Sequence, residues 1–196
     1  MKMYKKTILK TAIIALSLAS LASCKKDDDD VANPVNPNES EVITTVKVIV
    51  SPVSSPTTIS EFLFRDIDGD GGNAPTIDTI RLNANTDYNV QLLVLDETKN
   101  PVDTTSIEIE EEKNAHQFFY TKIGTYNLTT SYLDFDDNGV PLGLNMEFNT
   151  TTGFTIKTNK LQIVLKHQPA LKPTTGNGNE SLGETDVEIN FPILIQ

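Results

Sequence analysis

Short segments in which apolar and polar residues alternate run through most of this chain, and they restrict its fold more than any other feature. From Val42 to Val50, side chains alternate with the period of a half-buried strand. Similar segments cover residues 58–64, 86–95, 117–122, 125–135, 142–149, 161–166 and 186–195. No helical segment long enough for a parallel crossover lies between them. The pattern predicts an all-β protein, an antiparallel β-sandwich, Ig-like or near it, of about eight strands.

Two segments between these strands carry local signals. Asp136-Asp137-Asn138-Gly139 separates two alternating segments, and this composition predicts a hairpin turn. The segment SIEIEEEK at 106–113 alternates at first but then places three glutamates in succession. A strand would carry that charge on both faces, so we expect one short helix there, capped by Thr105 or Ser106.

The first residues indicate how the chain is exported. MKMYKK is basic and precedes a short apolar run, which is typical of a secretory signal rather than of a membrane-spanning helix. The stretch LASC at 21–24 resembles a bacterial lipobox, in which the cysteine after the cleavage site is lipidated. Cys24 is the only cysteine in the chain and so has no disulfide partner within it. We therefore expect a signal peptide at 1–23 and a lipid anchor on Cys24.

The residues after Cys24 predict a tether. KKDDDD at 25–30 resembles the export signal of Bacteroidota lipoproteins that are carried to the cell surface. The asparagines and prolines at 33–38 disfavour a helix. We expect a disordered acidic tether at 24–40 and a single folded domain at 41–196. The predicted location is the outer membrane, with the domain lipid-anchored and exposed at the cell surface.

The formal net charge of the whole chain is −11. The predicted signal contains four lysines and no acid, so its removal makes the chain more acidic still. This balance argues against nucleic acid as a partner, because nucleic-acid binding depends on basic side chains. It suits cations, cationic partners or simple solubility.

One loop resembles part of a calcium site. RDIDGDGG at 65–72 places Asp66, Asp68 and Asp70 at alternate positions before two glycines, as in the first half of an EF-hand loop. Position twelve of such a loop requires a bidentate glutamate, but here it is Ile77. The loop is therefore not an EF-hand, and strands rather than helices are predicted on both sides of it.

An acid from elsewhere, such as Glu61 or Asp78, can still complete a calcium shell around this loop. The competing interpretation is that aspartate and glycine are the residues that tight turns select. A second partial match, which includes Asp134 and Asp136, has Asn145 at position twelve and the same defect. We prefer a turn for both loops and keep calcium as the alternative for the first.

The chain has two histidines. His116 follows an acidic run and lies four residues after Glu112, which is one turn if that segment is helical. His167 ends a predicted strand. Imidazole and carboxylate groups together suit zinc or another transition-metal ion. His116, His167, Glu112 and Glu111 are therefore candidate metal ligands, although strand-end histidines are also commonly exposed or hydrogen-bonded.

Catalysis has little support in the sequence. No nucleophile-elbow pattern accompanies the two histidines, and no pair of carboxylates stands out for glycoside hydrolysis. We therefore expect that the protein is not an enzyme.

Several stretches resemble a family of small, poorly characterised Bacteroidota outer-envelope lipoproteins over nearly all of the predicted domain. They are FLFRDIDGDGGNAP, EIEEEKNAHQFFY, GLNMEFNTTTG, LKHQP and GETDVEINFPILIQ. Members are sometimes labelled as having a type 1 periplasmic-binding fold, which needs two α/β lobes and is at odds with the all-β pattern seen here. The resemblance implies an accessory role beside a TonB-dependent transporter.

The function expected from the sequence is a non-catalytic binding module at the cell surface. It would capture a metal ion or metal complex for a TonB-dependent outer-membrane transporter. The alternative is a structural or adhesive surface domain whose loops are ordered by calcium.

Overall fold

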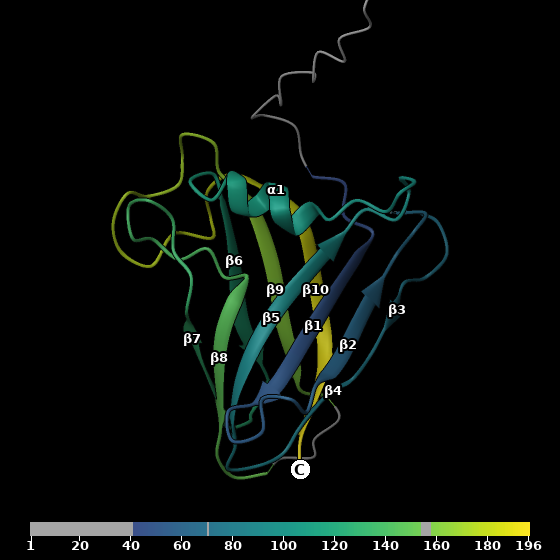
Figure 1. The fold of residues 1–196 in the computed structure, drawn as a ribbon, viewed down its shortest axis with the longest axis vertical. Coiled ribbons are helices and arrows are strands. Elements are labelled where there is room, and N and C mark those ends of the chain that lie inside the picture. The colour runs from purple at the N-terminus through teal and green to yellow at the C-terminus, as the bar shows by residue number, and fades with distance from the viewer. Residues whose placement is uncertain (1–40, 70, 154–157) are drawn as a thin grey trace, which may run out of the picture. The chain divides into compact units, whose positions relative to one another are not determined.

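The computed structural model describes residues 41–69, 71–153 and 158–196, and these form two stacked β-sheets (Figure 1). The larger sheet contains, in spatial order, β3 (Thr76–Ile77), β2 (Ser60–Arg65), β1 (Thr45–Pro52), β5 (Asp87–Leu95), β8 (Asn145–Thr150) and β7 (Leu128–Tyr132). The smaller sheet contains β4 (Ile80–Leu82), β10 (Glu184–Ile195), β9 (Lys160–His167) and β6 (His116–Ile123). The predicted all-β sandwich is confirmed. The predicted signal peptide, Cys24 and the tether lie outside the described residues.

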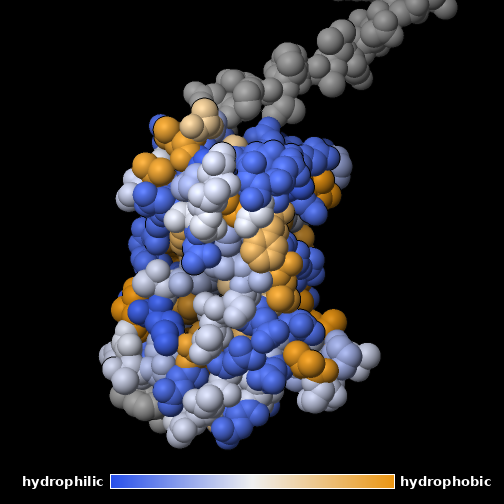
Figure 2. Space-filling view, turned by 90° about the vertical axis from the view of Figure 1, so that its left-hand side faces the viewer, coloured by the Kyte–Doolittle hydropathy of each residue, from blue (hydrophilic) through white to orange (hydrophobic). Residues whose placement is uncertain are grey.

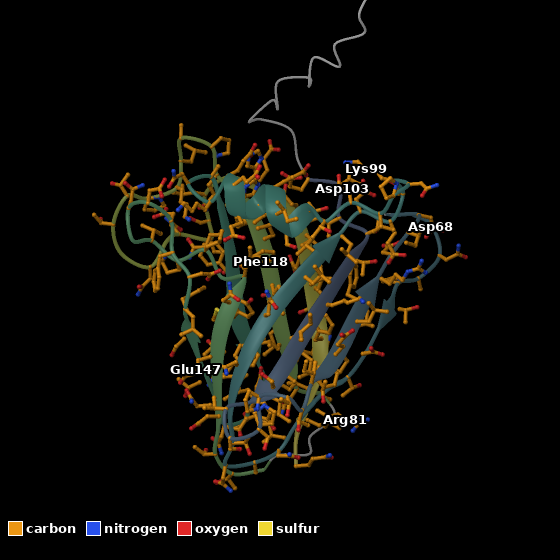
Figure 3. All side chains as sticks on the ribbon, in the orientation of Figure 1. Asp68, Arg81, Lys99, Asp103, Phe118 and Glu147 are labelled. Carbon is orange, nitrogen blue, oxygen red and sulfur yellow. The ribbon has the colours of Figure 1, made fainter. Side chains whose placement is uncertain are left out.

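The alternation in the sequence becomes the two faces of each strand. In β1, Val46, Val48 and Val50 are buried, and the strand pairs antiparallel with β2 on one side and β5 on the other. The apolar faces of the two sheets meet in one core, in which Phe118 and Phe148 are fully buried. Figure 3 shows Phe118 between the sheets. Each such side chain contributes about 1.5–3 kcal/mol to stability through burial.

The described residues form ten strands rather than about eight, and one strand pair is parallel. The additional strands β3 and β4 are only two and three residues long, too short for a periodic pattern to be recognised. β4 pairs parallel with the last residues of β10, from Ile80 opposite Ile193 to Leu82 opposite Ile195. Every other strand pair in this part of the chain is antiparallel, as predicted.

The short helix is also confirmed, as α1 (Thr105–Glu111). It lies across one end of the sandwich (Figure 1) and buries Ile109 completely. Its N-cap is Thr104, whose side chain makes no capping hydrogen bond, so the expected cap by Thr105 or Ser106 is wrong. Both residues are instead buried inside the first turn.

The predicted hairpin joins β7 to β8, which pair antiparallel from Leu128 opposite Thr150. At its turn, Asp136 Oδ1 accepts hydrogen bonds from the backbone N–H groups of Asn138 at 2.8 Å and Val140 at 2.9 Å. Gly139 has a φ of 79°, a conformation that glycine adopts without strain.

On the side of the molecule shown in Figure 2, apolar residues are scattered among hydrophilic ones. Among the described residues, no helix is both long enough and apolar enough to cross a membrane.

Candidate metal centre

The two histidines meet. His116 opens β6 and His167 closes β9, and the two residues are direct partners in the antiparallel register. Their rings are stacked, with centroids 4.6 Å apart and planes 9° apart. His116 is 0% exposed and His167 is 3% exposed. We call these two residues the histidine pair.

The histidine pair belongs to the core face of its sheet. His116 lies two residues before Phe118 and His167 two residues after Leu165, and both of these apolar side chains are fully buried. Because side chains alternate along a strand, the histidines point to the same side as the apolar residues. They therefore form the last layer of the core on β6 and β9.

A backbone contact assigns the proton of His116. Its Nδ1 lies 3.3 Å from the carbonyl oxygen of Glu112, just after α1. A carbonyl oxygen only accepts, so Nδ1 carries the proton and Nε2 carries the lone pair. Burial, and then repulsion from His167, lowers the pKa of His116 to about 4. The ring is therefore neutral at pH 7, which is the form that binds metal.

Three of the four predicted metal ligands come together. Glu112, His116 and His167 each offer a ligand atom, and these atoms lie within 4.8 Å of one another. Glu111 is exposed and does not belong to this group. The Nε2 atoms of both histidines are buried without a hydrogen-bond partner.

Two further carboxyl groups, which the sequence did not single out, lie against His116. Its Nε2 is 3.9 Å from Glu41 Oε1 and 4.0 Å from Asp186 Oδ2. The Asp186 side chain is 0% exposed, and neither of its oxygens has a hydrogen-bond partner. The Glu41 side chain is 14% exposed. We call Glu41, Glu112, Asp186 and the histidine pair the histidine cluster.

Asp186 reaches this place because β10 contains a bulge. Thr185 pairs with Lys166 and Val187 pairs with Leu165, so Asp186 has no partner on β9. An extra residue of this kind turns its side chain away from the regular alternation. Counting back in twos from the buried Ile189 would instead place Asp186 on the outer face.

Burial has the largest effect on the pKa of two carboxyl groups in the cluster, those of Glu41 and Asp186. Burial, followed by repulsion from Glu108 and Glu112, raises the pKa of Glu41 to about 7. Burial also raises the pKa of Asp186 to about 6, although His167 acts in the opposite direction. Since His116 is neutral at pH 7, its contacts with these carboxyl groups are not ion pairs there.

The donor atoms are spaced slightly more widely than ligands around one ion. Donors about 2.0–2.1 Å from a tetrahedral zinc ion are roughly 3.3 Å apart. The contacts from His116 Nε2 to Glu41 and Asp186, at 3.9 and 4.0 Å, are close to that spacing. His167 would have to rotate its ring to share the ion, because lone pairs in nearly parallel rings do not converge. The cluster therefore suits a divalent ion after small side-chain movements.

A buried lysine fixes the backbone at the histidine pair. Lys172 Nζ donates to the carbonyl oxygens of His116 at 2.8 Å and Lys113 at 2.7 Å. It also lies 3.1 Å from Asp136 Oδ2, and both charged side chains are only 1% exposed. Lys172 thereby ties the segment after β9 to the start of β6 and to the hairpin turn.

The loop that resembles a calcium site uses its aspartates internally. Asp66 Oδ1 accepts the backbone N–H of Gly69 at 3.0 Å. Asp68 Oδ2 accepts the backbone N–H of Asn73 at 2.9 Å and its side-chain amide at 2.7 Å, and these bonds hold the pKa of Asp68 below its usual value. Asp70 lies outside the described residues.

The acids that might have completed a calcium shell are engaged elsewhere. Glu61 lies 3.7 Å from the ammonium of Lys47, and Asp78 accepts the backbone N–H of Leu63 at 2.9 Å. In the second loop, Asp134 accepts hydrogen bonds from the backbone N–H groups of residues 143–145, at and just before the start of β8. Within the described part of the chain, these contacts favour turns over calcium sites.

Comparisons with protein-family models, with curated proteins and with solved structures find no match to this chain.

Proposed function

We propose that this chain is a non-catalytic lipoprotein that captures a divalent transition-metal ion at the histidine cluster. The observation that carries the proposal is the set of buried atoms without a partner: Nε2 of both histidines and both carboxylate oxygens of Asp186. Each unsatisfied buried polar atom costs about 1–3 kcal/mol. A cation bound at the cluster would offset part of these costs.

The chemistry of the donors indicates the class of ion. Imidazole nitrogen with carboxylate oxygen suits zinc and the neighbouring transition metals, whereas calcium prefers oxygen ligands alone. His116 is already neutral, with Nδ1 held by a backbone carbonyl, an arrangement common among metal-binding histidines. The cluster therefore favours a transition metal over calcium.

The predicted lipid anchor would place the domain beside a membrane protein that can take up the captured ion. Lipidation of Cys24 and the acidic tether would hold the domain near the outer membrane at the cell surface. The family resemblance adds a TonB-dependent transporter as the partner that receives the ion. Anchor, location and partner remain predictions from the sequence.

The test is titration calorimetry of the metal-free, full-length protein in detergent with Zn²⁺, Co²⁺ and Cu²⁺. We expect one ion per chain for the wild type and loss of binding in His116→Gln and His167→Gln. Glu147→Gln is the matched control, because this residue lies on β8, outside the histidine cluster (Figure 3). Absence of binding by the wild type, or binding unchanged in both histidine variants, would refute the proposal.

A further inference from the structure

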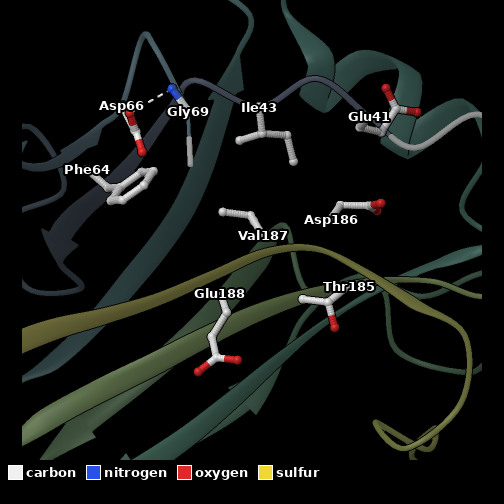
Figure 4. A pocket seen from close by; sticks show the side chains of 9 residues that line it. All are labelled: Glu41, Ile43, Phe64, Asp66, Gly69, Thr185, Asp186, Val187 and Glu188. Atoms are coloured by element: carbon white, nitrogen blue, oxygen red, sulfur yellow. Dashed lines mark hydrogen bonds between the residues drawn. The ribbon is translucent and has the colours of Figure 1, made fainter. Parts of the chain in front are cut away.

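A cleft of about 460 Å³ opens beside the histidine cluster (Figure 4). This volume lies within the range of small-ligand sites. Its lining consists of Glu41, Ile43, Phe64, Asp66, Gly69, Thr185, Asp186, Val187 and Glu188. The cleft therefore joins two features that are far apart in the sequence: the loop that begins at Asp66 and the carboxyl groups beside His116.

The cleft lies at the free edge of a strand. β4 pairs only with the last three residues of β10, from Ile193 to Ile195. Within the described strands, the first half of β10 therefore pairs only with β9. Four consecutive residues, 185–188, line the cleft. Because neighbouring side chains of a strand point to opposite faces, such a run borders the cleft along the strand edge.

The lining is negative and contains no lysine or arginine. Four of its nine residues are acids: Glu41, Asp66, Asp186 and Glu188. Of the neighbouring bases, Lys166 borders the cleft through its Nζ, which donates to the hydroxyl of Thr185 at 2.8 Å, whereas Arg65 pairs with Glu97 at 2.7 Å. A concave surface lined by one sign of charge concentrates counter-ions and speeds their association.

The inner end of the cleft leads to the atoms without partners. Glu41 and Asp186 both line the cleft and both lie within 4.0 Å of His116 Nε2. In Figure 4 these two residues occupy one end, and Asp66 with Gly69 occupies the other. The apolar side chains of Ile43 and Val187 lie between the two ends, and Phe64 lies beside Asp66. Asp66 at the outer end is half-buried, whereas the Asp186 side chain at the inner end is 0% exposed.

We propose that this cleft is the route by which a free, hydrated divalent cation reaches the histidine cluster, and that its charge excludes anionic metal chelates. This inference rests on the proposed function and narrows its substrate from "a metal ion or metal complex" to the uncomplexed cation. It also assigns a role to the RDIDGDGG loop: Asp66 stands at the outer end as a steering charge, while its bond to Gly69 shapes the turn.

The experiment is stopped-flow mixing of the full-length protein in detergent with Co²⁺, followed by the visible absorption of the bound ion. The variant is Asp66→Asn with Glu188→Gln, which removes two charges but keeps the carbonyl oxygens that accept from Gly69 and Gln162. We expect association to slow by roughly threefold to tenfold with dissociation unchanged, because steering acts on encounter. Glu147→Gln, outside the cleft, is the matched control.

Two further arms change the solution conditions. Raising the salt to about 0.5 M should slow association and remove the difference between wild type and variant, because exposed charges are then screened. In the second arm, Co²⁺ is supplied as its anionic citrate complex at the same total cobalt concentration. We expect the protein to bind Co²⁺ at least tenfold more slowly from this complex than from the aquo ion.

The outcomes separate the two proposals. If the wild type takes up no ion, the metal site itself is refuted and the route with it. Suppose that the ion binds, but that Co²⁺ associates with the charge variant as fast as with Glu147→Gln and the association rate does not change with salt. In that case only the route is refuted. Equal loading from the citrate complex would refute the exclusion of anionic chelates while leaving the metal site intact.

Discussion

Replacing Lys172 by methionine should destabilise the domain far more than replacing a neighbouring surface lysine. Lys172 Nζ is bound to three oxygens, from Asp136, His116 and Lys113, and its side chain is 1% exposed. Removing one partner of a buried ion pair costs about 3–5 kcal/mol, because the remaining charge is left uncompensated. We therefore expect the Lys172→Met change to lower the free energy of unfolding by about that amount, measured by urea denaturation of the full-length protein in detergent.

A second ion pair at the same hairpin turn is the control for the Lys172→Met experiment. Lys113 forms an ion pair with Asp137 at 2.6 Å, one residue along from Asp136, but these side chains are 33% and 63% exposed. Exposed pairs are worth about 0–1 kcal/mol, so Lys113→Met should change stability little. Adding Asp136→Asn to Lys172→Met should restore part of the loss, since the amide leaves no buried charge. Equal effects of the two lysine changes would show that burial does not set the strength of these pairs.

Three other changes test separate parts of the structure. In metal-free protein, the pKa of Glu41, raised from 4.5 to about 7, gives a stabilisation that is present below pH 4.5 and lost as the pH rises to 7. Glu41→Gln should therefore flatten the pH dependence of the free energy of unfolding across this window by about 3 kcal/mol. Gly143→Ala should lower the free energy of unfolding more than Gly139→Ala. Both glycines have positive φ angles, so both changes strain the backbone. A Cβ at position 143 would also lie 2.9 Å from the Cβ of Phe118, whereas a Cβ at position 139 meets nothing within 4 Å. Thermal melts at millimolar Ca²⁺ should match melts with chelator, and a clear rise in Tm with Ca²⁺ would revive the calcium interpretation of the Asp66 loop.

The longer strands were predictable because the alternation of apolar and polar residues in the sequence matches the alternation of buried and less buried side chains in the sheets. In β1, the alternation read from the sequence is the alternation of buried and half-buried side chains in the sheet. β3 and β4 escaped prediction because they contain only two and three residues and depend on neighbours that are distant in the sequence. The helix was predicted from its glutamates, but its first residue was not, because no side chain caps it.

The site was only partly predictable. His116 lies at the start of one predicted strand and His167 at the end of another, so antiparallel pairing of these two strands brings the residues together. That pairing is a long-range property, and the local pattern does not reveal which strands are neighbours. Asp186 could not be found in this way, since a single extra residue in β10 reverses the face that alternation predicts.

The histidine cluster places polar groups where the core could have been apolar. Two imidazoles and a carboxyl group continue the layers formed by Phe118 and Leu165, and their free nitrogen and oxygen atoms find no partner among the described residues. Apolar side chains of similar volume would avoid this desolvation cost. Local conflicts of this kind concentrate at functional sites, where stability is given up for binding. Lys172 is a buried charge of a different kind: its Nζ donates to two backbone carbonyl oxygens and lies 3.1 Å from Asp136 Oδ2. The strongest argument that the histidine cluster binds a ligand is that unpartnered atoms from His116 and Asp186 lie close together and belong to residue types that bind metal ions.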